Sequence, residues 1–144
     1  MILRLLAFLA LGATLHATEP VGWERVTVPS MKTSIYVGSV TLNTGDFIRH
    51  GEGFSTTYEA KVVPWFFWSE SGKIMIDVSA DDLAQLDAGQ AITFTGHALN
   101  HKKKPRKVSG QAQPADGSSG KIKVRIQVDN VELIFNGTYR LARS

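Results

Sequence analysis

A chain of 144 residues is long enough for one domain with its own hydrophobic core and does not require a second. It contains no cysteine, which excludes a disulfide framework and a lipid-modified cysteine, so burial of apolar side chains must stabilise the fold. The formal net charge of +3 is unevenly divided: residues 18–99 hold five Lys and Arg against ten Asp and Glu, a net −5, whereas residues 100–144 hold ten against three, a net +7.

The first residues, MILRLLAFLALGATLHATEP, have the order of a secretory signal peptide. One cation at Arg4 precedes an apolar run over residues 5–13, and small or polar residues follow as far as Ala17. The run is much shorter than the ~20 residues that a membrane-spanning helix needs. We therefore predict a signal peptide at 1–17, export to the periplasm or the exterior, and a mature chain without a transmembrane anchor.

The next segment, residues 18–33, contains two prolines and is expected to be a lead-in with at most one short edge strand. Strand-like alternation begins at residue 34, so the predicted β domain covers 34–144. Within it, SIYVGSVTLNTGDFI predicts a hairpin that turns around 43–46. The glycine-rich GEG at 51–53 predicts a break or bulge before the next strand.

Four aromatic residues follow a proline in PWFFW, residues 64–68. If the alternation of the preceding strand continues past Pro64 to a turn at SESG, Phe66 and Trp68 point inward and Trp65 and Phe67 point outward. Large aromatic rings bury ~150 to 250 Å² each, so leaving two of them in water is costly. Either the chain covers them with its own lead-in or helix, or Trp65, Phe67 and Trp68 border a surface that binds a ligand or partner.

A single helix is predicted in SADDLAQLDAG, residues 79–89. Ser79 is a favourable N-cap, two aspartates in the first turn complement the helix dipole, and Gly89 is a favourable end. We expect Leu83 and Leu86 of this short connecting helix to close one end of the sheet.

Two further hairpins follow. In the first, Ile92 and Phe94 share an inward face with several Gly and Ala residues, which leaves room for a bulky side chain or marks a sharply coiled sheet. In the second, a turn at Asp129-Asn130 pairs Val128 with Val131 and every following apolar residue with another apolar residue. The predicted fold is all-β, a single antiparallel meander barrel or sandwich of about seven strands with one short connecting helix.

The cations of HKKKPRK are concentrated at the expected tip of the first of these hairpins. They are either a solvated loop or an anion-binding tip formed by His101, Lys102, Lys103, Lys104, Arg106 and Lys107. The charge division of the chain fits an anion-binding face, and it equally fits oppositely charged neighbouring strands.

The sequence contains none of the common catalytic or nucleotide-binding motifs, and we expect neither a cofactor nor a nucleic-acid partner. The leading hypothesis is an exported, non-enzymatic binding protein of the cell envelope. Its partner would be a lipid, another amphipathic molecule with an anionic end, or an anionic envelope polymer, bound by the aromatic and basic residues named above. The alternative is a structural or adaptor protein that docks a partner through the aromatic sheet edge. A hydrolase that uses His50 and Glu52 as base and orienting carboxylate is a third hypothesis.

Overall fold

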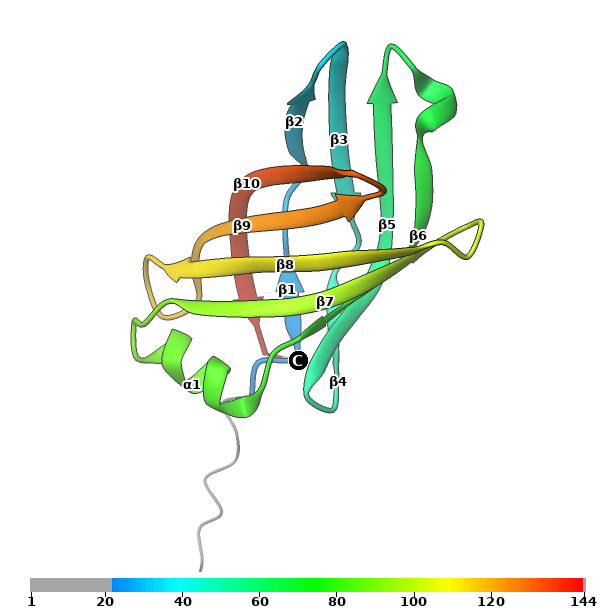
Figure 1. The fold of residues 1–144 in the computed structure, drawn as a ribbon. Helices are drawn as coiled ribbons and strands as arrows, with labels where there is room; N and C mark the ends of the chain where they lie inside the picture. The colour runs from blue at the N-terminus through cyan, green and yellow to red at the C-terminus, as the bar shows by residue number, and fades with distance from the viewer. Residues whose placement is uncertain (1–21, 144) are drawn as a thin grey trace, which may run out of the picture.

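Alternating apolar and polar side chains form ten strand segments in the computed structural model, which describes residues 22–143 (Figure 1). The strands are β1 (Arg25–Thr27), β2 (Met31–Ile35), β3 (Gly38–Thr44), β4 (Phe47–His50), β5 (Gly53–Val63), β6 (Glu70–Asp77), β7 (Ile92–Asn100), β8 (Pro105–Pro114), β9 (Ser119–Val128) and β10 (Val131–Ala142). A short 3-10 helix, η1 (Phe66–Trp68), lies between β5 and β6, and the helix α1 (Ala80–Asp87) lies between β6 and β7.

The strands close into one antiparallel barrel. The sheet order is β2-β3-β5-β4-β1-β10-β9-β8-β7-β6, and β5 also pairs with β6, which joins the chain of pairings into a ring. Arg25 pairs with Ile48 and Met31 pairs with Leu42 in a single continuous register. The segments β1 and β2 are therefore one interrupted strand and β3 and β4 are another, so the barrel has eight strands. This confirms the meander barrel, with eight strands where about seven were expected, and excludes the sandwich.

The lead-in expected at 18–33 contributes β1 and the start of β2 to this barrel. Since β1 pairs with β4 on one side and with β10 on the other, it closes the ring and is not an edge strand. The predicted signal peptide at 1–17 lies outside the described residues. Within residues 22–143, no helix has the length and apolar character needed to cross a bilayer.

Two turns differ from the sequence prediction, the first in its position and the second in its kind. The first hairpin turns at Tyr36 and Val37, and a second turns at Gly51 and Glu52, where a break was expected. The predicted turn at 43–46 is wrong, because this segment is a bulge: the register of β5 shifts by one residue between its pairing with β3 and its pairing with β4. Gly45 is required there by close approach, since a Cβ atom at this position would lie 2.8 Å from the Thr56 hydroxyl oxygen.

The barrel interior is filled by the inward residues that the alternation predicts. Phe54, Phe135 and Leu42 are among the largest fully buried side chains. The predicted pairing of the last hairpin is confirmed from Val128 with Val131 to its far end. Phe94 lies over Gly110, where a Cβ atom would be 2.5 Å from the ring, so the small inward residues of β8 make room for a neighbouring aromatic side chain.

The helix α1 covers one end of the barrel, as predicted. Ser79 accepts a hydrogen bond from the Asp82 backbone N–H at 3.1 Å, and its own N–H donates to the Asp82 carboxylate at 3.0 Å, a complete capping box. Leu83 and Leu86 are buried, and Gly89 adopts a φ of 82° after the helix ends.

Alternate turns of an up-and-down barrel lie at the same end of the barrel. One end holds α1 together with the β4–β5 and β8–β9 turns, and the other holds the turns β2–β3, β5–β6, β7–β8 and β9–β10 (Figure 1). We call the second group the mouth turns. No α-helix covers this end in the described part of the chain.

Candidate functional site

The four mouth turns surround an open cavity of about 670 Å³. Its walls are mainly aliphatic and come from Ile35, Val40, Ala60, Val62, Val128 and Leu133, with Tyr36, Val37, Phe67, Trp68 and Val131 nearer the opening. Polar residues complete the lining: Ser69, Glu70, Asn100, His101, Lys102, Lys104, Arg106 and Asp129. Below it lies a narrow apolar void of about 20 Å³ that shares Ala60, Glu70, Val128 and Leu133 with the cavity. The void is bounded underneath by Leu42, Ile74 and Phe135.

A buried ion pair lies in the lining of the cavity. The guanidinium of Arg106 donates from Nη2 to Glu70 Oε2 at 3.0 Å and from Nε to Glu70 Oε1 at 3.3 Å. Only 8% of the Arg106 side chain and 15% of the Glu70 side chain are exposed. Tyr58 and Asn100 also donate to the Glu70 carboxylate, each at 3.0 Å, and Arg106 Nη1 donates to Asp129 at 3.3 Å. Every charge in this network is therefore partnered within the protein.

The network changes the titration of its members. Burial alone would raise the pKa of Glu70, but the hydrogen bonds from Arg106, Asn100 and Tyr58 outweigh it and hold the pKa below its ordinary range. Burial, together with the neighbouring Glu70 charge, raises the pKa of Tyr58. At neutral pH the Glu70 carboxylate is therefore ionised beside the Arg106 guanidinium, and the Tyr58 phenol is protonated.

This shift makes the barrel sensitive to acid. Because the pKa of Glu70 is lower in the folded state, the stabilisation it provides is present above its unfolded pKa of about 4.3 and is lost as the pH falls through the folded value. Urea unfolding at a series of pH values from neutral to acid tests this shift. Below about pH 4.3, the free energy of unfolding should fall more steeply with decreasing pH in the native chain than in Glu70→Gln. Asp116, whose pKa is lowered by hydrogen bonds from Ser118 and Ser119, is present in both proteins and cancels in the comparison. Equal slopes would contradict the assigned shift.

The aromatic run forms the β5–β6 turn and not a strand. Proline lacks the N–H that a ladder needs, and after Pro64 the chain forms η1, with the Trp68 N–H donating to the Trp65 carbonyl at 3.0 Å. The predicted inward and outward alternation is therefore wrong, as is the turn at SESG, most of which belongs to β6. All four rings are exposed, at 38, 77, 63 and 57% for Trp65, Phe66, Phe67 and Trp68.

Neither residues 22–33 of the lead-in nor the helix covers these rings, so the intramolecular alternative is wrong for the described part of the chain. Leu83 and Leu86 of α1 are buried at the opposite end of the barrel, and Trp23 is buried beside Arg143, whose guanidinium lies 4.9 Å from its ring centre. Of the aromatic run, Phe67 and Trp68 line the cavity and Trp65 does not.

Residues 101–104 of the basic segment form the β7–β8 turn, which is held in place by Asn100. The Asn100 side-chain oxygen accepts hydrogen bonds from the backbone N–H groups of Lys102 and Lys104, each at 2.9 Å, and Lys103 adopts a φ of 61° at the tip. The His101 N–H donates to the Ser71 carbonyl at 2.7 Å, which ties the turn to β6. The turn therefore has a defined conformation in which the lysine side chains extend into solvent.

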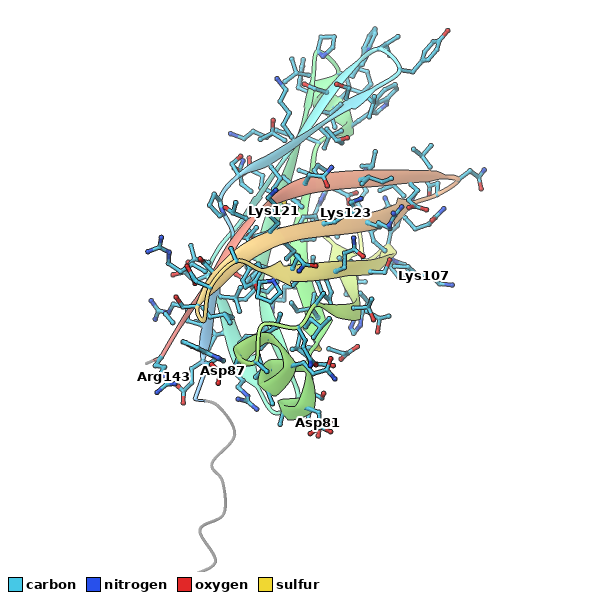
Figure 2. All side chains as sticks on the ribbon, turned by 90° about the vertical axis from the view of Figure 1, so that its left-hand side faces the viewer. Asp81, Asp87, Lys107, Lys121, Lys123 and Arg143 are labelled. Atoms are coloured by element: carbon cyan, nitrogen blue, oxygen red, sulfur yellow. The ribbon has the colours of Figure 1, made fainter. Side chains whose placement is uncertain are left out.

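The structure divides the predicted basic residues into three groups. His101, Lys102 and Lys104 line the cavity, and Lys103 is exposed at the tip beside them. Arg106 points inward and is neutralised by Glu70 and Asp129. Lys107 is exposed on the outer face of the barrel, where Figure 2 also shows Lys121 and Lys123 on β9.

No protein-family model, curated protein or solved structure matches this chain. Its function must therefore be inferred from its own geometry. His50 and Glu52 are exposed near the helix end of the barrel, beside an open polar groove that Glu52 lines and His50 does not.

The site includes residues that the sequence interpretation passed over, namely Tyr36, Tyr58, Glu70 and Asn100. A signal for two members of the network was present. Glu70 has the same parity as the inward Ile74, and Arg106 has the same parity as the inward Val108. Opposite charges on the apolar faces of two strands indicate a buried pair, because an unpaired charge there would be prohibitively costly.

Proposed function

We propose that this protein binds one amphipathic molecule with its apolar tail in the mouth cavity and its anionic head at Lys102 and Lys104 of the β7–β8 turn. The observation that carries the proposal is that an apolar cavity and unpaired cations share one opening. Within residues 22–143 none of the ion pairs involves Lys102 or Lys104.

The size and lining of the cavity support an apolar tail. Small-molecule sites typically have volumes of ~300 to 1,000 Å³, are mostly apolar and have few polar groups, and the mouth cavity of about 670 Å³ falls within this range. Each methylene group transferred from water to such walls contributes roughly 0.8 kcal/mol. Val40 and Val62 are buried yet border the cavity, and they pair with each other on the adjacent strands β3 and β5, so a tail inserted there would meet a continuous aliphatic wall.

The charges at the opening favour an anionic head over a cationic or neutral one. Arg106 lies in the lining but is already paired with Glu70 and Asp129, so binding an anion there would require breaking those contacts. Lys102 and Lys104 carry no such partner in the described chain and can turn toward a head group without that cost. The head group is therefore assigned to the turn and not to the buried network.

Export, predicted from residues 1–17, and a location in the cell envelope remain part of the proposal. They would place the protein where lipids and other amphipathic molecules are abundant. No step of the proposed binding requires a catalytic group.

Calorimetric titration with a single-chain fatty acid below its micelle concentration tests the proposal, with the fatty alcohol of the same length as a control. We expect one fatty acid per chain. Replacing Lys102 and Lys104 by Ala should weaken fatty-acid binding about fivefold to tenfold and leave the alcohol unaffected, because only the acid carries a charge. Lys107→Ala, which removes a cation from the outer wall, is the matched control and should bind the fatty acid as the native chain does.

Ala60→Trp tests the cavity itself. Ala60 lines both the cavity and the void below it, so an indole at this position should fill the space and abolish binding of both probes. The proposal fails if neither probe binds the native chain, or if Ala60→Trp binds them unchanged while remaining folded by circular dichroism.

A further inference from the structure

The cavity is encircled by side chains that protrude farther than ligand binding requires. Tyr36 is fully exposed at the β2–β3 turn, and Phe66 is 77% exposed at the β5–β6 turn although it does not line the cavity. Lys103, at the tip of the β7–β8 turn, is also exposed without lining it. We call these protruding side chains the mouth rim. Its members are Tyr36, Trp65, Phe66, Phe67 and Trp68 of the first two mouth turns and Lys102, Lys103 and Lys104 of the third.

The aromatic part of the mouth rim is held in place by its own contacts. Trp68 and Ser69 donate backbone hydrogen bonds back into the turn, each at 3.0 Å, and the Ser69 hydroxyl accepts from the Val62 N–H at 2.9 Å. The rings pack against each other, with centres 5.5 Å apart for Phe67 and Trp68 and 6.0 Å apart for Phe66 and Phe67. Fixed, protruding rings, with Val37 and Val131 also exposed at the mouth turns, indicate contact with an apolar phase.

The charge on the mouth rim is positive, and the opposite end of the barrel differs. Lys102, Lys103 and Lys104 are adjacent in the β7–β8 turn, and no ion pair in the described chain neutralises them. The helix end has exposed aspartates, of which Figure 2 shows Asp81 and Asp87 on α1, away from the mouth turns. An anionic surface would therefore attract the mouth end and repel α1.

We propose that the mouth rim docks on a lipid bilayer that contains anionic head groups, with the aromatic turns in the interfacial layer and the three lysines among the head groups. Tyr and Trp favour this layer because they combine an apolar ring with a polar group. Lysines next to an anionic bilayer add attraction that salt weakens. A bilayer suits the shape of the rim, because separate turn tips can enter lipid together without a complementary solid surface.

Docking in this orientation has a consequence for the bound molecule. The rim surrounds the opening of the cavity, so a tail could pass between the bilayer and the barrel without crossing water. Docking depends on the rim and ligand binding depends on the cavity, so the two can be separated by substitution.

Co-sedimentation with vesicles tests the proposal, using phosphatidylcholine alone and phosphatidylcholine mixed with phosphatidylglycerol. We expect binding to the mixed vesicles that weakens with added salt, and about tenfold weaker binding to phosphatidylcholine alone. With brominated acyl chains in the mixed vesicles, tryptophan fluorescence should be quenched. Quenching would report Trp65 and Trp68, since the third tryptophan, Trp23, is buried at the other end of the barrel.

The variant Phe66→Ser with Lys103→Glu alters the rim outside the cavity. It should reduce binding to mixed vesicles at least about tenfold while leaving binding of the fatty alcohol in solution unchanged, because the alcohol has no charge for Lys103→Glu to repel. Met75→Ser with Lys107→Glu makes the same kind of change on exposed residues of β6 and β8, away from the rim, and should bind vesicles as the native chain does. Ala60→Trp should lose the fatty acid and still bind vesicles.

Three results would overturn the proposal. The native chain could fail to sediment with mixed vesicles, or the rim variant could bind them as well as its control does. If the native chain self-associates but does not bind vesicles, and the rim variant no longer self-associates, the rim is instead a protein interface. In each case the fatty-acid titration reports separately whether the cavity binds its ligand.

Discussion

Glu70→Gln is expected to destabilise the barrel by about 3 kcal/mol, because it leaves the buried Arg106 guanidinium without its main partner. Glutamine also presents an N–H₂ donor to Arg106, Asn100 and Tyr58, all of which donate to Glu70 in the native structure. The effect should lie at the lower end of the range for buried pairs, because the network borders an open cavity and Asp129 remains beside Arg106. Urea unfolding at neutral pH measures it through the midpoint and slope of the transition.

The matched control is Glu132→Gln, which breaks the pair of Glu132 with Arg125 at 2.7 Å. Both side chains of that pair are about half exposed, so the expected loss is about 0.5 kcal/mol or less even though the contact is shorter. A double-mutant cycle of Glu70→Gln with Arg106→Met should show coupling, because the double variant removes the stranded charge. Similar small losses in Glu70→Gln and Glu132→Gln would mean that water solvates the network and that it does not stabilise the mouth.

The strands could be predicted because side chains alternate between the two faces of a strand. Once one face is known to be buried, the alternation fixes the direction of every other side chain in that strand. In β9 the polar residues Lys121, Lys123 and Gln127 all point away from the core, and a slip of one residue against β10 would have buried them. The helix was predictable for a similar reason, since the Ser79 cap and the two buried leucines are local signals that tertiary packing did not have to override.

The turns were less predictable, because one residue type serves several purposes. Gly45 in an Asn-Thr-Gly-Asp segment fits a turn, yet the structure uses it for close approach in a bulge, whereas Tyr36 and Val37 form a real turn without any typical turn residue. The predicted alternation of the aromatic run was wrong for a related reason. The predicted alternation requires the strand to continue past Pro64, and only the three-dimensional pairing of β5 with β6 shows that it ends before the aromatic residues.

The sequence predicted which residues belong to the candidate site better than it predicted how they are arranged. Phe67, Trp68, His101, Lys102 and Lys104 do lie around one cavity, although they are distant in sequence, because alternate turns of a closed meander meet at one end. The exclusion of Lys107 follows from strand parity and could have been foreseen. Strand parity places both Arg106 and Glu70 on inward faces, but their contact also depends on which strands become neighbours around the barrel, which no local pattern encodes.

Phe135→Ala is expected to destabilise the barrel by about 4 kcal/mol and also to lengthen the tail that the cavity accepts. Phe135 is 1% exposed, and truncating a buried Phe typically costs ~3 to 5 kcal/mol because apolar contacts are lost and a cavity remains. Phe67→Ala is the same change on a ring that is 63% exposed, and it should cost less than about 1 kcal/mol. Urea unfolding of the two variants measures the difference.

The effect on binding follows from where Phe135 lies. It bounds the narrow void beneath the mouth cavity, so removing the ring should join the two spaces and admit a longer tail. Each additional methylene that becomes buried should improve binding roughly fourfold, so Phe135→Ala should prefer longer fatty acids than the native chain, whereas Phe67→Ala should not. Calorimetric titration with a series of fatty acids of increasing length measures this preference, and Phe135→Leu, a milder truncation, provides the same test if the alanine variant does not fold. An unchanged length preference in a folded variant would mean that the tail does not reach the floor of the mouth cavity. A tail that contacts the floor gains space when Phe135 is truncated, so its preferred length must increase.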